Sequence, residues 1–182
     1  MIAARAPRLS HPALLGMALF IASESIFFAA IVMVYVALRP GGLAAARAEL
    51  DVPRTLLFSL LLFSSSATMA RAERRSAPWL LLTGGLGAAF LTGQGLEYAR
   101  LLGSGIGPST GLFGTTFFTL TGLHGLHVFV GLVAIAGLLL ASWRDGDRIR
   151  GVAWECVAWY WHFVDGVWVV VFSVVYLGTL LG

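Results

Sequence analysis

Long apolar stretches alternate with short polar segments along the whole chain, and five of the stretches are long enough to cross a membrane as helices. A hydrocarbon core of about 30 Å requires roughly 20 apolar residues in a helix. Prolines and paired glycines interrupt the pattern, as in Arg39-Pro40-Gly41-Gly42. We therefore expect an all-α, polytopic membrane protein that forms one domain over residues 1–182. The predicted transmembrane helices cover approximately residues 11–38, 53–70, 78–101, 112–142 and 153–181.

The composition supports the same conclusion. Hydrophobic residues make up 58% of the chain and charged residues 12%, whereas soluble domains are only about half apolar. All twelve basic residues are arginines, and they lie in predicted loops or near helix ends. No basic patch of the kind that binds nucleic acid is evident. Cys156 is the only cysteine, which excludes an internal disulfide and a Cys-x-x-Cys-His haem attachment.

The arginine distribution predicts the orientation in the membrane. Five crossings place the N-terminus on the same side as two loops, the one between the second and third helices and the one between the fourth and fifth helices. This side holds eight arginines, against four on the other, and cytoplasmic loops carry the excess of arginine. We expect a cytoplasmic N-terminus and an outside C-terminus. The eight arginines are Arg5, Arg8, Arg71, Arg74, Arg75, Arg144, Arg148 and Arg150.

Glu24 lies about ten residues into the first predicted helix and therefore near the middle of the membrane. A carboxyl group at that depth needs a partner or a proton. The flanking Ser23 and Ser25 could satisfy it locally, which would make its role structural. The other interpretation is a proton-accessible or lipid-facing polar cleft, and the sequence leaves both open.

His124 and His127 are three residues apart in the fourth predicted helix and should face roughly one side of it. Two histidines could suggest a metal site, but the first three helices add only a histidine at the membrane edge. Further ligands would therefore be lacking. We favour hydrogen bonds to neighbouring helices at a contact lined by Gly122, Gly125 and Gly131, since small residues allow close packing.

The last predicted helix carries Glu155, His162 and Asp165 near one face. A carboxylate beside a histidine can hold the tautomer of the imidazole or share a proton with it. A structural His–Asp contact is the favoured interpretation, and a proton relay is the alternative. Trp168 is too deep for the interfacial belt of aromatic residues, so it should pack against a partner helix or lipid.

Further structural contacts are expected near the helix ends. Glu97 and Arg100 are spaced i,i+3 and could form an ion pair. Trp159 and Trp161 lie near the start of the last helix, where aromatic side chains often mark the membrane interface. A binding surface for a partner is predicted at small residues where backbones can approach closely. These residues are Gly84, Gly87, Gly122 and Gly125.

Four blocks of sequence are distinctive, and they are Gly16–Glu24, Gln94–Tyr98, Phe117–Val128 and Trp159–Asp165. In this order they resemble subunit III of the haem-copper respiratory oxidases, the cytochrome c oxidase type. The chain matches the short, five-helix bacterial form and lacks the first two helices of larger members. The resemblance implies a non-catalytic bundle beside catalytic subunit I and subunit II, in an inner membrane of bacteria.

The resemblance also implies functional details. The haem and copper would reside in partner subunits, and this chain would bind phospholipid in a V-shaped cleft and support proton uptake during oxygen reduction in aerobic respiration. Glu24 matches the membrane-buried glutamate of the family. The matching polar contacts of the family are His124, His127, His162 and Asp165.

Alternative functions remain for a chain with this pattern. An accessory subunit of a nitric oxide reductase or quinol oxidase would have the same fold. A stand-alone proton-coupled transporter would also contain buried acids and histidines. A transporter predicts an inverted repeat or broken helices, and the sequence shows neither.

Overall fold

The computed structural model describes residues 11–38, 50–72, 77–145 and 151–178, and all regular structure in these ranges is helical. The prediction of five helices is confirmed, and the helix ends that lie within the described residues differ from the predicted ones by at most three residues. The last helix finishes in a π-helical turn, and residues 179–181 of its predicted range lie outside the described residues. The elements are α1 (Pro12–Leu38), α3 (Val52–Ala72), α4 (Ala77–Gly103), α5 (Gly111–Asp145), α6 (Val152–Phe172) and η4 (Ser173–Leu177).

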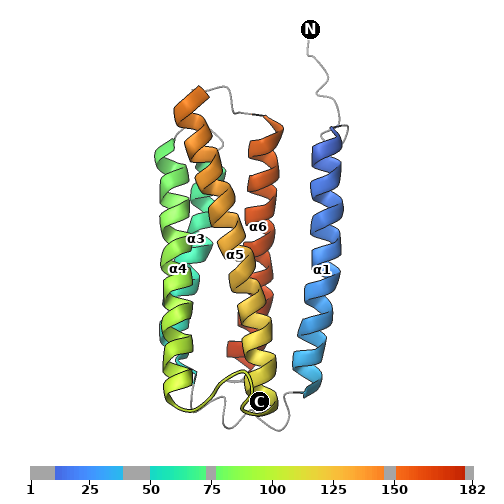
Figure 1. The fold of residues 1–182 in the computed structure, drawn as a ribbon, viewed down its shortest axis with the longest axis vertical. Coiled ribbons are helices and arrows are strands. Elements are labelled where there is room, and N and C mark those ends of the chain that lie inside the picture. Colours follow the sequence, from blue (N-terminus) through green and yellow to red (C-terminus); the bar gives the residue numbers. More distant parts are fainter. Residues whose placement is uncertain (1–10, 39–49, 73–76, 146–150, 179–182) are drawn as a thin grey trace.

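The helices form an antiparallel bundle with one peripheral member (Figure 1). α3, α4, α5 and α6 pack in a closed ring, in which each helix contacts its two neighbours. α1 lies outside this ring, against α5 and α6. The first and last described residues therefore lie at opposite ends of the bundle. Most of the arginines that predicted the orientation, such as Arg5 and Arg150, fall outside the described residues.

Four of the five helices are long and apolar enough to cross a membrane on their own, and α4 is the exception. α4 has 27 residues, the same length as α1, and it packs along α3 and α5 as one member of the ring. Its last turns hold Gln94, Glu97 and Arg100, which lower its apolar character. α4 therefore depends on protein neighbours to shelter its polar groups within a bilayer.

One stripe of α1 faces the bundle. The less exposed residues recur every three or four positions, which is the spacing of helices that pack side by side at a shallow angle. Glu24 falls on this stripe, whereas Leu19, Ile26 and Met33 on other sides are exposed. The carboxyl group therefore faces α5 and α6. The stripe consists of Leu14, Met17, Ile21, Glu24, Phe28, Ile31 and Tyr35.

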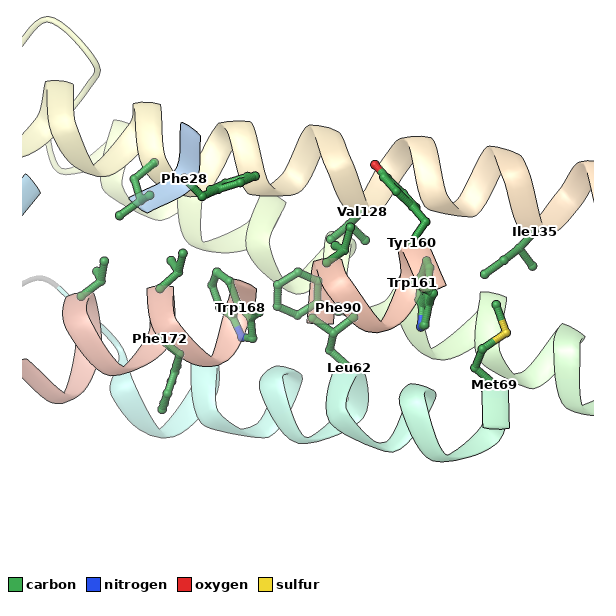
Figure 2. Close-up of a cluster of buried hydrophobic side chains, with 14 of the residues drawn as sticks. Phe28, Leu62, Met69, Phe90, Val128, Ile135, Tyr160, Trp161, Trp168 and Phe172 are labelled. Atoms are coloured by element: carbon green, nitrogen blue, oxygen red, sulfur yellow. The ribbon is translucent and has the colours of Figure 1, made fainter. Parts of the chain in front are cut away.

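The core is built around two tryptophans of α6 (Figure 2). Trp161 and Trp168 are both buried and lie close to Leu62 of α3 and Phe90 of α4. The rings of Phe90 and Trp168 meet edge to face, with centroids 4.8 Å apart. Aromatic packing of this kind adds to the energy of area burial. The prediction that Trp168 packs against partner helices is confirmed.

Glycines make room for these tryptophans. A Cβ atom on Gly87 would lie 2.5 Å from Trp161 Cη2, and one on Gly131 would lie 2.9 Å from Trp161 Cε3. Gly87 of the predicted binding surface is therefore taken up by a contact within the chain, whereas Gly84 and Gly122 are partly exposed, and the rest of that surface stays a prediction. Cβ atoms there would meet Ile135, Trp161, Tyr98 and Leu91, for Gly84, Gly87, Gly122 and Gly125 respectively.

Candidate functional site

The Glu24 side chain contacts His127 across the α1–α5 interface. The distance from Glu24 Oε2 to His127 Nε2 is 3.3 Å, and the two side chains are only 22% and 14% exposed. Phe28 packs edge-on against the imidazole at 5.0 Å between ring centroids. The Tyr160 hydroxyl donates a 2.9 Å hydrogen bond to the backbone carbonyl of His127. Three helices therefore meet at this histidine.

The geometry constrains the protons of the pair. His127 Nδ1 lies 2.9 Å from the carbonyl oxygen of Leu123, and a carbonyl can only accept, so Nδ1 carries a hydrogen. A neutral imidazole then presents a lone pair at Nε2. An unprotonated Glu24 would place a second lone pair 3.3 Å away. A hydrogen on Glu24 or on His127 Nε2 would allow these two atoms to form a hydrogen bond.

The serines beside Glu24 do not satisfy its carboxyl group. The Ser23 hydroxyl donates to the backbone carbonyl of Phe20 at 2.7 Å, and the Ser25 hydroxyl donates to that of Ile21 at 2.7 Å. Hydroxyl groups in helices commonly bond back to the preceding turn in this way. Of the two interpretations left open, satisfaction by the flanking serines is not what the structure shows, and Glu24 instead contacts His127 on another helix.

His124 and His127 contact different helices, contrary to the expectation of a shared side. The His124 ring stacks on Trp168 of α6 with centroids 4.8 Å apart, and its edge meets Phe90 of α4. Neither ring nitrogen of His124 has a hydrogen-bond partner among the described residues. The prediction of interhelical hydrogen bonds therefore fails for His124. A rotation of about 60° between i and i+3 positions suffices to reach two interfaces.

A second polar cluster joins α3 to α6 at Ser66. The Ser66 hydroxyl bonds Asp165 Oδ2 and also lies 3.2 Å from His162 Nδ1. Asp165 is buried, and His162 is exposed at the edge of the bundle. His162 and Asp165 thus meet through a hydroxyl group instead of touching directly. Sequence reasoning missed Ser66, although the run Ser64-Ser65-Ser66 within an apolar helix was an available signal.

Two further α3 serines hold the core tryptophans. Trp161 Nε1 donates to Ser65 Oγ at 2.9 Å, and Trp168 Nε1 donates to Ser59 Oγ at 2.8 Å. Both serine hydroxyls donate in turn to carbonyls of their own helix. Buried indole groups need such an acceptor. α3 therefore presents a series of hydroxyl groups to α6.

The predicted Glu97–Arg100 pair is present near the end of α4. Arg100 Nη2 lies 2.7 Å from Glu97 Oε1, and the Glu97 side chain is 3% exposed. The backbone N–H of Asp51 donates to the same oxygen at 3.3 Å. Because Asp51 precedes α3, the buried carboxyl group connects the start of that helix to α4.

Glu155 and Trp159 join neither polar cluster. Glu155 lies in the first turn of α6, seven residues before His162, and both Glu155 and Trp159 are partly exposed. In the described part of the chain, no three His, Cys, Asp or Glu side chains come together to hold a metal ion.

A shallow groove opens between α4 and α5. Its volume is about 260 Å³. The Tyr98 hydroxyl and Thr121 Oγ1 bond each other at 2.7 Å beside it. Gln94 is buried at the same place. The lining residues are Leu91, Gln94, Gly95, Tyr98, Thr121, Gly122 and Gly125.

Comparison with known proteins points to the same family as the four sequence blocks. The family model described as Cytochrome c oxidase subunit III matches residues 6–179. The chain belongs to the cytochrome c oxidase subunit III family. Cytochrome c oxidase subunit 3 of Thermostichus vulcanus is 35% identical, with 93% of this chain and 90% of that protein covered. Cytochrome bo(3) ubiquinol oxidase subunit 3 of Pseudomonas aeruginosa is 33% identical, with 89% and 83% covered.

A third relative, cytochrome c oxidase subunit 3 of Bacillus sp. strain PS3, is 33% identical, with 92% of this chain and 86% of that protein covered. As a member of the subunit III family, the chain is a multi-pass membrane protein and an accessory subunit of a haem-copper oxidase complex. The resemblance seen in the four sequence blocks is thus confirmed. In the structure, Glu24 of the first block meets His127 of the third.

Proposed function

We propose that this chain is the non-catalytic subunit III of a proton-pumping oxidase, where it stabilises catalytic subunit I together with subunit II. The supporting observation is the family match over residues 6–179 in a bundle whose buried polar groups are joined in pairs and clusters. Haem and copper belong to the partner subunits, and the membrane is the inner membrane of a bacterium with the N-terminus in the cytoplasm.

Within this proposal, the Glu24–His127 pair is the site that would take part in proton uptake. Two side chains of types that can each carry a proton lie 3.3 Å apart at the interface of α1 and α5. A group of this kind can accept or release a proton when its surroundings change. The pair would support proton uptake by the neighbouring subunit. Bound phospholipid would cover the exposed apolar sides of α1.

The electron donor of the complex is cytochrome c or a quinol. Relatives named for each are similar to this chain, at 35% identity for a cytochrome c oxidase subunit and 33% for a ubiquinol oxidase subunit. None of the relatives reported above carries the name of a nitric oxide reductase. We therefore propose an oxidase complex and leave this choice of donor to experiment.

Purification of the tagged chain in a mild detergent tests the proposal. We expect a complex with haem absorbance in which peptide mass identifies subunits I and II, and no haem on the separated chain. Reduction by added cytochrome c or by a quinol then identifies the donor. A complex without haem would overturn the proposed function. Haem retained by the separated chain would show that the chain is itself a redox protein.

A further inference from the structure

The His162 imidazole is exposed at the middle of a membrane-spanning helix. Among the ionisable side chains whose exposure the structure describes, only two others are exposed, and both of these, His11 and Arg71, lie at helix ends. His162 lies ten residues after Val152 at the start of α6, which is about 15 Å along the helix axis. The apolar segment ends at Leu177, so His162 lies within about 4 Å of its middle.

The inner side of the His162 ring is already bonded. Nδ1 lies 3.2 Å from Ser66 Oγ on α3, and the Ser66 hydroxyl donates to Asp165 Oδ2. Nε2 is the ring nitrogen that remains, and it has no hydrogen-bond partner among the described residues. The bond to Ser66 restricts rotation of the ring. His162 is therefore a fixed polar group on the outside of the bundle.

Hydrocarbon cannot supply a partner for His162 Nε2. A ring nitrogen of histidine either donates or accepts a hydrogen bond. The segment from Val152 to Leu177 exceeds the hydrocarbon thickness by only about 5 Å at each end, so the ring lies roughly 10 Å inside the hydrocarbon region. Phospholipid headgroups are beyond its reach at that depth. Ionisable residues within membrane spans almost always pair with another polar group or face a water-filled cavity.

His162 belongs to an exposed face of α6 between α1 and α3. Phe163 packs against Phe28 of α1, and Asp165 bonds Ser66 of α3. Successive residues of a helix are about 100° apart, so four exposed positions lie between these two contacts. A Cβ atom on Gly166 would meet nothing within 4 Å, and a small residue one turn from a polar group lets another helix approach closely. We call this the α6 open face, and it consists of His162, Gly166, Val169 and Ser173.

We propose that the α6 open face is the docking site for a transmembrane helix of another subunit, which places a hydroxyl, amide or carboxyl group against His162 Nε2. Each of these groups can supply the donor or the acceptor that the ring requires. Ser66 and Asp165 are positioning residues, because they hold the ring from the inner side. The proposal rests on the proposed function as an accessory subunit, and it assigns the contact surface and its chemistry.

A photo-crosslinking side chain at Val169 identifies what covers the α6 open face in the intact complex. Val169 is 49% exposed and lies seven residues after His162, two turns along the same side of α6. We expect adducts with a transmembrane peptide of another oxidase subunit, identified by mass. Adducts with lipid alone, or with a second copy of this chain, would overturn the proposal.

His162→Leu tests the polar contact with the subunit identified in this way. We expect its affinity for this chain in mild-detergent micelles to fall about three- to twentyfold. His162→Gln should retain the subunit, because its amide can donate or accept. Ser66→Ala removes only the inner bond of the ring and should cost less affinity. Full retention by His162→Leu would overturn the proposal, as would an equal loss with Ser66→Ala, which would assign the effect to the inner bond.

Gly166→Leu tests the close approach separately. Its matched control is Gly137→Leu on α5, because both glycines are exposed and a Cβ atom on either would meet nothing within 4 Å. We expect Gly166→Leu to lose the subunit and the control to keep it, and equal retention would contradict the docking site. A wild-type preparation without haem would contradict the proposed function, whereas a haem-containing complex without the Val169 adduct would contradict the docking site alone.

Discussion

Trp168 Nε1 on α6 donates a 2.8 Å hydrogen bond to Ser59 Oγ on α3, and both side chains are fully buried. Ser59→Ala would leave the indole N–H without its acceptor. Interhelical hydrogen bonds in membrane proteins contribute about 0.6 kcal/mol on average and up to about 1.7 kcal/mol. We expect a loss in this range in the free energy of unfolding, measured by SDS titration in mixed micelles. Ser64→Ala, an exposed serine bonded within its own helix, should have almost no effect.

Gly87→Ala should destabilise the bundle because the new methyl group collides with the Trp161 ring. Overpacking of this kind typically costs about 1 to 3 kcal/mol. Gly85→Ala is the matched control, two residues away in the same helix and in open space. It should stabilise the helix slightly, since alanine favours helices over glycine. Equal unfolding energies for the two variants would contradict the proposed role of Gly87.

Ser66→Ala removes the group that joins Asp165 and His162. The buried carboxyl group would lose its partner, which costs about 1 to 3 kcal/mol in the free energy of unfolding. If Ser66 is the connection, adding Asp165→Ala to Ser66→Ala should cost less than the sum of the single changes. Additive energies in this double-mutant cycle would show that the two residues act independently.

Glu24→Gln should keep α1 in place, because the amide N–H can donate to His127 Nε2. Glu24→Leu removes the contact and should lower the equilibrium constant for docking of α1 onto the bundle by about three- to twentyfold. Cys156 allows a direct measurement, since its Sγ lies 3.7 Å from the backbone oxygen of Ala13 on α1. In an Ala13→Cys background, a short thiol–thiol crosslinker reports how often α1 is docked. Equal yields for both variants would show that the carboxyl group does not hold the helix.

Features that depend on one segment alone could be predicted from the sequence. The five helices follow from apolar length, and the Glu97–Arg100 pair follows from i,i+3 spacing within a single helix. The depth of Trp168 in α6 placed it away from the membrane interface, whereas its burial against other helices depended on the rotation of α6. Each of these depends on distances along the chain, which a helix fixes at 1.5 Å per residue.

Contacts between helices could not be predicted, because they depend on rotation and relative height. His124 and His127 are close in sequence, yet they contact α6 and α1 respectively. Likewise, Gly87 faces the core whereas Gly85 faces outward. The Ser66 cluster combines residues of α3 and α6 that lie almost a hundred positions apart. The periodicity of one helix does not tell which neighbouring helix each of its faces will contact.

The peripheral position of α1 has a consequence for biogenesis. Its neighbours are α5 and α6, which follow it along the chain, so α1 can take its place only after both have been synthesised. Until then, Glu24 lacks its contact with His127. A carboxyl group at membrane depth needs another partner during that interval.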